Sequence, residues 1–489
     1  MIEKYYSGVI EQIYNRIGKE TRNIVMANYS NDFSIENLEV IRRYQSNEDN
    51  VFFAYSEFSY NTLVGAYEPF LDIICNMHRR FIGGSFDDFQ KECGVYYLHR
   101  QVLNSYYETG ECFREETVLL NEVAYEQRRM TMAIADMLKR LSEVKPLMIV
   151  INRFQMASKS SIETIKYLID NPCANIGIVL GVNALVKGAD STLEVWDSIV
   201  ESLEDRSAVY YIGSAGQLKN TVKTTNDDEM YITMNFEQSI QEASNIMEFL
   251  DFEQAKRGCR IIEHKLKFED AWIDEKSLRR FYMVYARTSV LLGEMSKAIE
   301  LTNEFKALIP ENDSEHYLSL YYFMKGTCYM YQGKLEKAGN SAKSAYDYAV
   351  LAEDDILIFK AELLSVMIKM SGWYNIFFCV QDIPVSDEII EKLIKHGYRN
   401  HLAHIYIYAY DNSRDVVKQS FYDESLLKHF TKGLELAKEI GNEKLVYDAY
   451  QKTIMLASTS GLNEIAFLYV IRTYEFMKGH GNIYVARLQ

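Results

Sequence analysis

One stretch, residues 146–183, constrains the fold of this chain more than any other. Two short apolar runs, residues 147–151 and 176–182, are rich in isoleucine and valine, and a segment with helical spacing, residues 160–170, separates them. Short apolar runs on either side of a helix are typical of buried parallel strands, because both faces of a parallel sheet are covered. The stretch therefore predicts a β-α-β unit.

The first 216 residues continue this alternation of strands and helices. Further apolar runs predict strands at residues 23–29, 50–57 and 208–212. The helices that we expect between them start at Pro69 or cover residues 2–17, 34–44, 122–141, 160–170 and 190–203. Five strands alternating with helices predict a three-layer α/β domain with a parallel sheet over residues 1–216. The polar residues 217–235 follow as a predicted linker.

Residues 236–489 have almost exclusively helical patterns, and they repeat. Gly293 and Gly333 are 40 residues apart, and so are Ala298 and Ala338. A period near forty residues, with a glycine between two helices and a small alanine where they cross, indicates a helical solenoid. The sequence thus predicts an all-α superhelical domain over residues 236–489.

Composition excludes several classes of protein. The net charge of −16 argues against a nucleic-acid-binding surface, because phosphate contacts need clustered Lys and Arg. The seven cysteines form no CxxC pair, which favours reduced thiols in a cytoplasmic protein. Nowhere do 18 apolar residues follow one another, so the sequence predicts no membrane contact.

Three histidines, His396, His401 and His404, lie close together in the predicted solenoid, and two of them could share one helix face. No neighbouring carboxylate or cysteine completes a metal-binding set with them. We therefore expect histidines on a repeat helix, no metal and no cofactor.

The first helices of solenoid repeats line a concave face, where a protein, peptide or small-molecule effector can bind. Arginines among apolar side chains suit a partner with a carboxylate or phosphate, although an ordinary solvated surface is the alternative. The side chains that the repeat register turns into this groove are Arg280, Met283, Arg287, Phe323, Thr327, Met330 and Tyr331.

Two motifs give a resemblance to a known family. After the central strand, Gln155 and Ala157 match the family pattern Gln-Trp-Ala-Asp, and Tyr67, Pro69 and Phe70 match its Tyr-x-Pro-Phe. The chain resembles the large LuxR-type regulators of the STAND class, which join a P-loop ATPase domain to tetratricopeptide-like repeats. Small residues in the predicted first helices of two repeats, Ala286 and Gly326, and Pro310 at a repeat end agree with such repeats.

The catalytic residues of that family are missing. The phosphate loop should follow the first strand, but residues 27–37 contain neither the glycines nor the lysine that hold phosphates. Asn152, Arg153 and Ser158 replace the family's acidic residues, which hold magnesium in working enzymes. The resemblance therefore implies a degenerate P-loop-NTPase-like domain, a pseudo-ATPase, and no enzyme.

The resemblance implies signal-responsive control of transcription by a non-catalytic regulatory protein. The helix-turn-helix of LuxR-type relatives is not recognisable, so we expect either a longer regulator or a separate DNA-binding partner. Two alternatives are an ATP-dependent STAND switch with a divergent nucleotide site and a tetratricopeptide scaffold without an effector.

Overall fold

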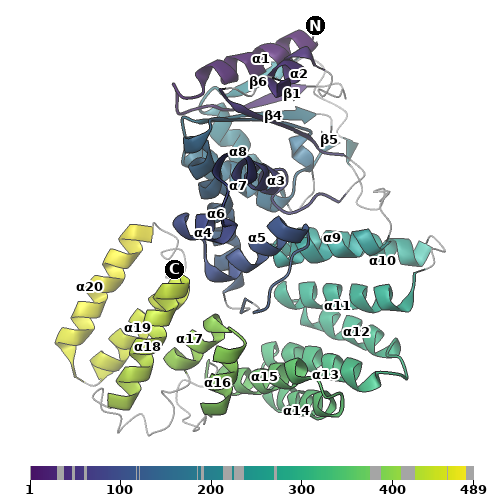
Figure 1. Cartoon of the computed structure of the whole chain (residues 1–489), viewed down its shortest axis with the longest axis vertical. Helices are drawn as coiled ribbons and strands as arrows, with labels where there is room; N and C mark the ends of the chain where they lie inside the picture. The colour runs from purple at the N-terminus through teal and green to yellow at the C-terminus, as the bar shows by residue number, and fades with distance from the viewer. Residues whose placement is uncertain are drawn as a thin grey trace. The chain divides into compact units, whose positions relative to one another are not determined.

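The computed structural model describes residues 2–29, 38–46, 50–59, 63–116, 118–119, 122–183, 186–188, 192–212, 223–224, 236–268, 273–374, 387–408, 424–459 and 461–480 (Figure 1). The chain forms two compact units. The first contains Met1–Val95, His99–Arg114 and Val123–Leu292, and the second contains Tyr96–Leu98, Glu115–Glu122 and Gly293–Gln489. Two short segments, residues 96–98 and 115–122, therefore belong to the second unit, although the residues on either side of them belong to the first.

A five-stranded parallel sheet forms the centre of the first unit, as predicted. Its strands are β1 (Ile24–Tyr29), β2 (Phe52–Glu57), β3 (Leu147–Asn152), β4 (Ile176–Asn183) and β6 (Val209–Ile212), in the order β2-β3-β4-β1-β6. Every residue of β3 and β4 is buried, which explains why their sequences are continuous apolar runs.

Helices cover both faces of this sheet, so the predicted three-layer arrangement is confirmed (Figure 1). On one face, α1 (Ile2–Arg16) and α2 (Glu39–Ser46) pack into a core that includes Ile10, Ile41 and Val179. The helices of the other face are α6 (Val123–Val144), α7 (Lys159–Asp170) and α8 (Leu193–Glu204). The predicted start of the second helix at Ser34 lies outside the described residues.

Glycine at two positions of β4 lets α1 approach the sheet closely. A Cβ on Gly177 would lie 2.8 Å from a side-chain carbon of Ile17. A Cβ on Gly181 would lie 2.8 Å from Asn152 Oδ1 and closer still to the Tyr6 hydroxyl. Any larger residue would force these neighbours apart, so the two glycines fix the spacing between α1 and the sheet.

Short helices precede α6 in the interval between β2 and β3. A helix starting at Pro69 is predicted there, whereas the pattern of residues 81–116 gives no clear prediction. The short helices are α3 (Phe70–Met77), a π-helical turn (His78–Ile82), α4 (Phe86–Glu92) and α5 (Tyr97–Thr109). Pro69 precedes α3, as expected of a proline at a helix start. A two-residue strand, β7 (Lys223–Thr224), lies in the predicted linker and pairs with β5 (Val186–Lys187).

Every described segment from Phe236 onwards that has regular secondary structure is a helix, as the sequence pattern predicts. Three of these helices belong to the first unit: α9 (Phe236–Glu248), α10 (Phe252–Phe268) and α11 (Glu275–Leu291). The second unit contains α12 (Met295–Ala307), α13 (Ser314–Tyr331), α14 (Leu335–Leu351), α15 (Asp355–Tyr374), α16 (Asp387–Lys395), α17 (Arg399–Tyr408), α18 (Glu424–Ile440), α19 (Glu443–Thr459) and α20 (Asn463–His480).

The predicted glycine and alanine positions have the geometry that a helical repeat needs. Gly293 and Gly333 follow α11 and α13 with φ angles of 77° and 71°, a left-handed conformation that favours glycine. Ala298 and Ala338 in the next helices are fully buried. Among the described residues, none of the helices is both long and apolar enough to cross a membrane.

Candidate functional site

The carboxyl edge of the sheet is the candidate site, because ligands of open parallel α/β sheets bind where the strands end. Tyr29, Glu57, Asn152 and Asn183 are the last residues of four neighbouring strands. Parallel pairing brings them to one edge, with Tyr29 opposite Asn183 and Glu57 opposite Asn152. The predicted phosphate-loop residues 30–37 lie outside the described part of the chain.

Asn152 is fully buried at this edge. The Tyr29 hydroxyl donates a short hydrogen bond to Asn152 Oδ1. The ring of Tyr6 meets the ring of Tyr29 edge-on, with centroids 6.4 Å apart. The amide oxygen of Asn152, which replaces an acidic residue of the family motif, is thus neutral, and it faces a tyrosine hydroxyl in the protein interior.

Arg153, the next residue, is bound to the adjacent strand. Its Nη1 lies 3.0 Å from Glu57 Oε1 and donates a hydrogen bond of 3.2 Å to the carbonyl oxygen of Phe58. The backbone of Arg153 is left-handed, with φ of 54°, where β3 turns into the following 3-10 helix, Phe154–Met156. The Tyr55 hydroxyl also donates to Glu57. The strand-end carboxylate is therefore neutralised by an arginine of the same sheet.

Gln155 and Ser158 have structural roles at this edge. The Gln155 side chain accepts a hydrogen bond from the Asn183 backbone N–H (3.3 Å) and donates one to the Asn183 carbonyl oxygen (3.5 Å). Ser158 is the N-cap of α7 and accepts from the Ser161 N–H at 3.4 Å. The residue that replaces the family's last acidic position thus starts a helix.

A small pocket of about 210 Å³ opens at the ends of β1 and β4. Amide, hydroxyl and aromatic side chains line it, among them Asn28, Gln155, Thr192 and Trp196. Within the part of the chain that the structure describes, no charged side chain contributes to its lining. Such a pocket offers dipoles but no fixed charge to a phosphate or a metal ion.

The predicted groove residues lie on two helices that belong to different compact units. Arg280, Met283 and Arg287 are on α11. Arg287 Nη2 lies 2.9 Å from Glu248 Oε1, and Arg280 donates a hydrogen bond to Gln241. Both acceptors belong to α9, so these arginines link neighbouring repeat helices in the first unit.

The other four groove residues are on α13 in the second unit. Met330 is buried in a cluster with Ala338 and Leu364, against which Phe323 and Tyr331 pack. The Thr327 hydroxyl donates to the Phe323 carbonyl oxygen at 2.9 Å. Packing between repeat helices accounts for these contacts, and effector binding in the groove stays a prediction.

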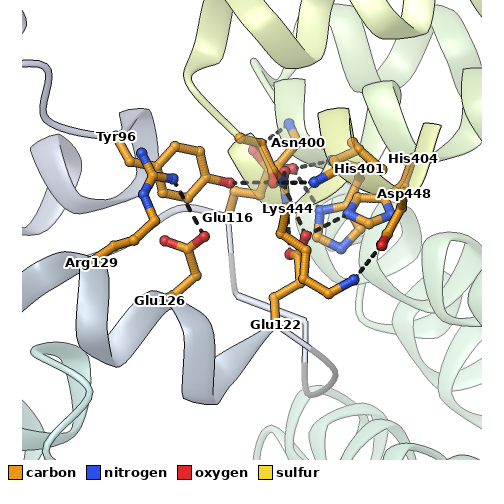
Figure 2. A network of polar contacts seen from close by, with 12 residues as sticks. Tyr96, Glu116, Glu122, Glu126, Arg129, Asn400, His401, His404, Lys444 and Asp448 are labelled. Atoms are coloured by element: carbon orange, nitrogen blue, oxygen red, sulfur yellow. Dashed lines mark hydrogen bonds and ion pairs between the residues drawn. The ribbon is translucent and has the colours of Figure 1, made fainter. Parts of the chain in front are cut away.

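His401 and His404 are both buried on α17, and carboxylates from a distant segment bind them (Figure 2). His401 Nδ1 lies 2.6 Å from Glu116 Oε1, and His404 Nε2 lies 3.0 Å from Glu122 Oε1. Glu116 and Glu122 belong to the segment 115–122 of the second unit. The sequence pattern does not predict the roles of Glu116 and Glu122, because more than 280 residues of chain separate them from their histidine partners.

Glu116 also binds the start of α17, where it accepts hydrogen bonds from the N–H groups of Asn400 (3.1 Å) and His401 (2.5 Å). A carboxylate is favourable there because a helix N-terminus carries free N–H groups and a positive dipole end. The Tyr398 hydroxyl donates to the Glu115 carbonyl oxygen at 2.7 Å. The segment 115–122 is thus bound by both its backbone and its side chains.

Glu122 is fully enclosed by donors. It accepts hydrogen bonds from His404, from Asn442 (3.0 Å) and from Asn400 (3.3 Å). Burial by itself raises the pKa of Glu122, but the charge and hydrogen bond of His404 and the two amides outweigh burial and lower it to about 2. The network is a closed structural unit, and no metal-binding set of three or more ligands occurs among the described residues.

No protein-family model matches the chain, and no curated protein matches it. Among solved structures, the chain is similar to the crystal structure of a Signal Transduction ATPase with Numerous Domains (STAND) protein with a tetratricopeptide repeat sensor from Pyrococcus horikoshii. The two sequences are 12% identical, and the similarity covers 98% of this chain and 83% of that chain with a TM-score of 0.43. A similarity at this level does not extend to function, which has to be argued from the residues themselves.

Proposed function

We propose that this protein is a non-catalytic, signal-responsive regulatory protein. In this proposal a degenerate ATPase-like α/β domain is joined to tetratricopeptide-like repeats that bind a protein, peptide or small-molecule effector. The observation that carries the proposal is the pairing of Asn152 with Tyr29 and of Arg153 with Glu57 at the carboxyl edge of the sheet.

This pairing disfavours a magnesium ion at the strand ends. Mg²⁺ in phosphate-transferring sites is held by carboxylates and phosphate oxygens. The oxygen of Asn152 is neutral, buried and hydrogen-bonded, and the guanidinium beside it would repel a cation. Glu57 is the carboxylate at this edge that could attract a metal, but Arg153 already neutralises it at 3.0 Å.

The segment where a phosphate-binding loop would be expected, residues 27–37, supports the same proposal. A triphosphate needs backbone N–H groups of a glycine-rich loop and a lysine. Residues 27–37 contain no glycine and no lysine, and Asp32 adds a negative charge. The neighbouring pocket at Asn28 and Gln155 is lined by uncharged side chains. Both halves of a nucleotide site therefore lack the groups that bind it.

We propose more specifically that the protein acts in transcription control, as the resemblance to LuxR-type regulators implies. The net charge of −16 opposes direct binding of DNA by these residues. A separate DNA-binding partner would then make the contact with DNA, and the helical repeats would recruit it.

The experiment is mass spectrometry of the purified protein under native and denaturing conditions. The proposal predicts that no nucleotide copurifies and that a protein, peptide or small effector does. Stoichiometric ADP or ATP would support the alternative, an ATP-dependent switch. A preparation with neither nucleotide nor any bound partner would favour a scaffold without an effector.

A further inference from the structure

An open cleft of about 490 Å³ lies within the first unit, and it shares no lining residue with the pocket at the ends of β1 and β4. Three elements form its walls: α6, α7 and the turn between α9 and α10. Its volume lies in the range of small-molecule sites, which is roughly 300–1,000 Å³. The cleft joins the layers around the sheet to the first repeat hairpin, so a ligand there would contact both.

The turn between α9 and α10 is fixed in the cleft wall by Asp251. This buried carboxylate accepts hydrogen bonds from the N–H groups of Ser160 in α7 (3.0 Å) and Gln254 in α10 (3.4 Å). Gln127 of α6 donates to the carbonyl oxygen of Leu250 at 2.7 Å. Hydrogen bonds thus connect this turn to α6, α7 and α10, which fixes the shape of the cleft wall.

Some charged groups of the cleft have protein partners and are not available to a ligand. Lys166 Nζ lies 2.7 Å from Ser198 Oγ and 3.7 Å from a carboxylate oxygen of Asp170. The Tyr167 hydroxyl lies 3.4 Å from Asp136 Oδ1.

Four charged side chains of the lining are not engaged in this way: Arg128, Lys159, Glu163 and the exposed Glu253. Within the described residues, no hydrogen bond or ion pair joins Glu163, Arg128 or Lys159 to another side chain. Glu163 is half-buried on α7, and burial raises its pKa, an effect increased by Asp251 and opposed by Lys159 and Arg128. One wall of the cleft therefore has a partly buried carboxylate that pairs with no side chain of the described residues, and two cations lie close enough to influence its pKa.

We propose that this cleft binds a small zwitterion, namely a free α-amino acid. Its ammonium group would bind the Glu163 carboxylate, and its carboxylate would bind the side chains of Arg128 and Lys159. The inference rests on the proposed function, because it names the chemical class and the place of a small effector.

The charges of the lining favour a zwitterion over other ligands. A phosphate or a dicarboxylate would meet the negative charges of Glu163 and Asp251. A simple amine would leave the Arg128 guanidinium without a partner, and an apolar molecule would cover all of these charges without replacing their water. A ligand with one group of each sign satisfies both.

The test is a calorimetric titration of the full-length protein with each of the twenty common amino acids at millimolar concentration. For an amino acid that binds, its N-acetyl derivative and its methyl ester are titrated next. The proposal predicts that both derivatives bind at least about tenfold more weakly, because each has lost one charge.

Matched variants locate the site. In Glu163→Gln the amino acid and its N-acetyl derivative should bind with similar affinity. In the double variant Arg128→Gln and Lys159→Gln the same should hold for the amino acid and its methyl ester. Glu194→Gln, on the exposed surface of α8, is the control and should bind like the wild type. Thermal melting of each variant checks that it is folded.

Absence of binding by every amino acid would overturn the inference, and so would binding that neither cleft variant changes. Either result would leave the proposed function intact, because that proposal is tested by copurification and by ATP binding. Stoichiometric nucleotide would remove the proposed function without deciding what the cleft binds.

Discussion

His404 Nε2 lies 3.0 Å from Glu122 Oε1, and both side chains are buried in the second unit. The pair joins α17 to a segment that precedes it by 282 residues. The residues flanking this segment, Arg114 and Val123, belong to the first unit. Glu122 directly precedes α6 in the chain, so its carboxylate is held by α17 at the residue before that helix begins.

The first prediction concerns that pair. Glu122→Gln and His404→Gln should each reduce the free energy of unfolding by about 3–5 kcal/mol, because each leaves a buried polar group without its partner. The loss in free energy of unfolding of the double variant should be clearly smaller than the sum of the losses of the two single variants. Urea unfolding measures the cycle, with the exposed Glu115→Gln as control. Additive costs would show that the two side chains do not interact.

The second prediction is a pH dependence of the first unit. Burial, together with the smaller effect of the negative charges of Glu68 and Asp72, raises the pKa of Glu242 to about 7. The folded state therefore holds a proton that the unfolded chain loses near pH 4.5, so stability should fall as the pH rises from 4.5 to 7.

Replacement of Glu242 by glutamine should remove this loss. Relative to the wild type, the free energy of unfolding of the variant should increase by up to about 3 kcal/mol between pH 5 and pH 8. One unit of pKa shift corresponds to about 1.4 kcal/mol. Thermal or urea unfolding at both pH values measures it, with Glu194→Gln as control. Parallel pH profiles for wild type and Glu242→Gln would refute the assignment.

The third prediction tests the helical repeat. Ala298→Leu and Ala338→Leu should each lower the free energy of unfolding by about 1–3 kcal/mol, because both alanines are fully buried where repeat helices meet. Ala307→Leu at the exposed end of α12 adds the same side chain without this crowding and should be nearly neutral. If all three variants melted at the same temperature, the assigned repeat register would be wrong.

The fourth prediction concerns Arg287 in the predicted groove. Its side chain is 40% exposed, and Arg114 also contacts Glu248, so Arg287→Ala should change stability by about 1 kcal/mol or less. Binding of a partner recovered by copurification should nevertheless weaken, because the variant removes an accessible guanidinium. Arg260→Ala, on α10, is the matched control. Equal affinity of both variants for the partner would place the binding site elsewhere.

Local patterns in the sequence predicted most of the architecture. The buried strands at Leu147–Asn152 and Ile176–Asn183 are visible because a parallel sheet requires continuous apolar runs. The repeat is visible because Gly293 and Gly333 need the same backbone conformation. Such features depend on neighbouring residues, so the sequence alone displays them.

The side-chain pairs at the carboxyl edge of the sheet and around α17 join residues that are far apart in the chain. The sequence identified Asn152 and Arg153 as substitutions, but it could not show that Tyr29 and Glu57 pair with them, since this follows from the order and register of the strands. Likewise, nothing near His401 and His404 in the sequence points to Glu116 and Glu122. An acidic residue in an irregular segment has no periodicity that reveals its partner.

The last prediction tests the central claim, that the carboxyl edge of the sheet does not bind ATP. The measurement is thermal melting of the full-length protein with and without saturating ATP and magnesium. A ligand at 100 times its dissociation constant would stabilise the protein by about 2.7 kcal/mol. We predict no change in melting temperature. An increase of several degrees that disappears when residues 27–37 are substituted would contradict this account.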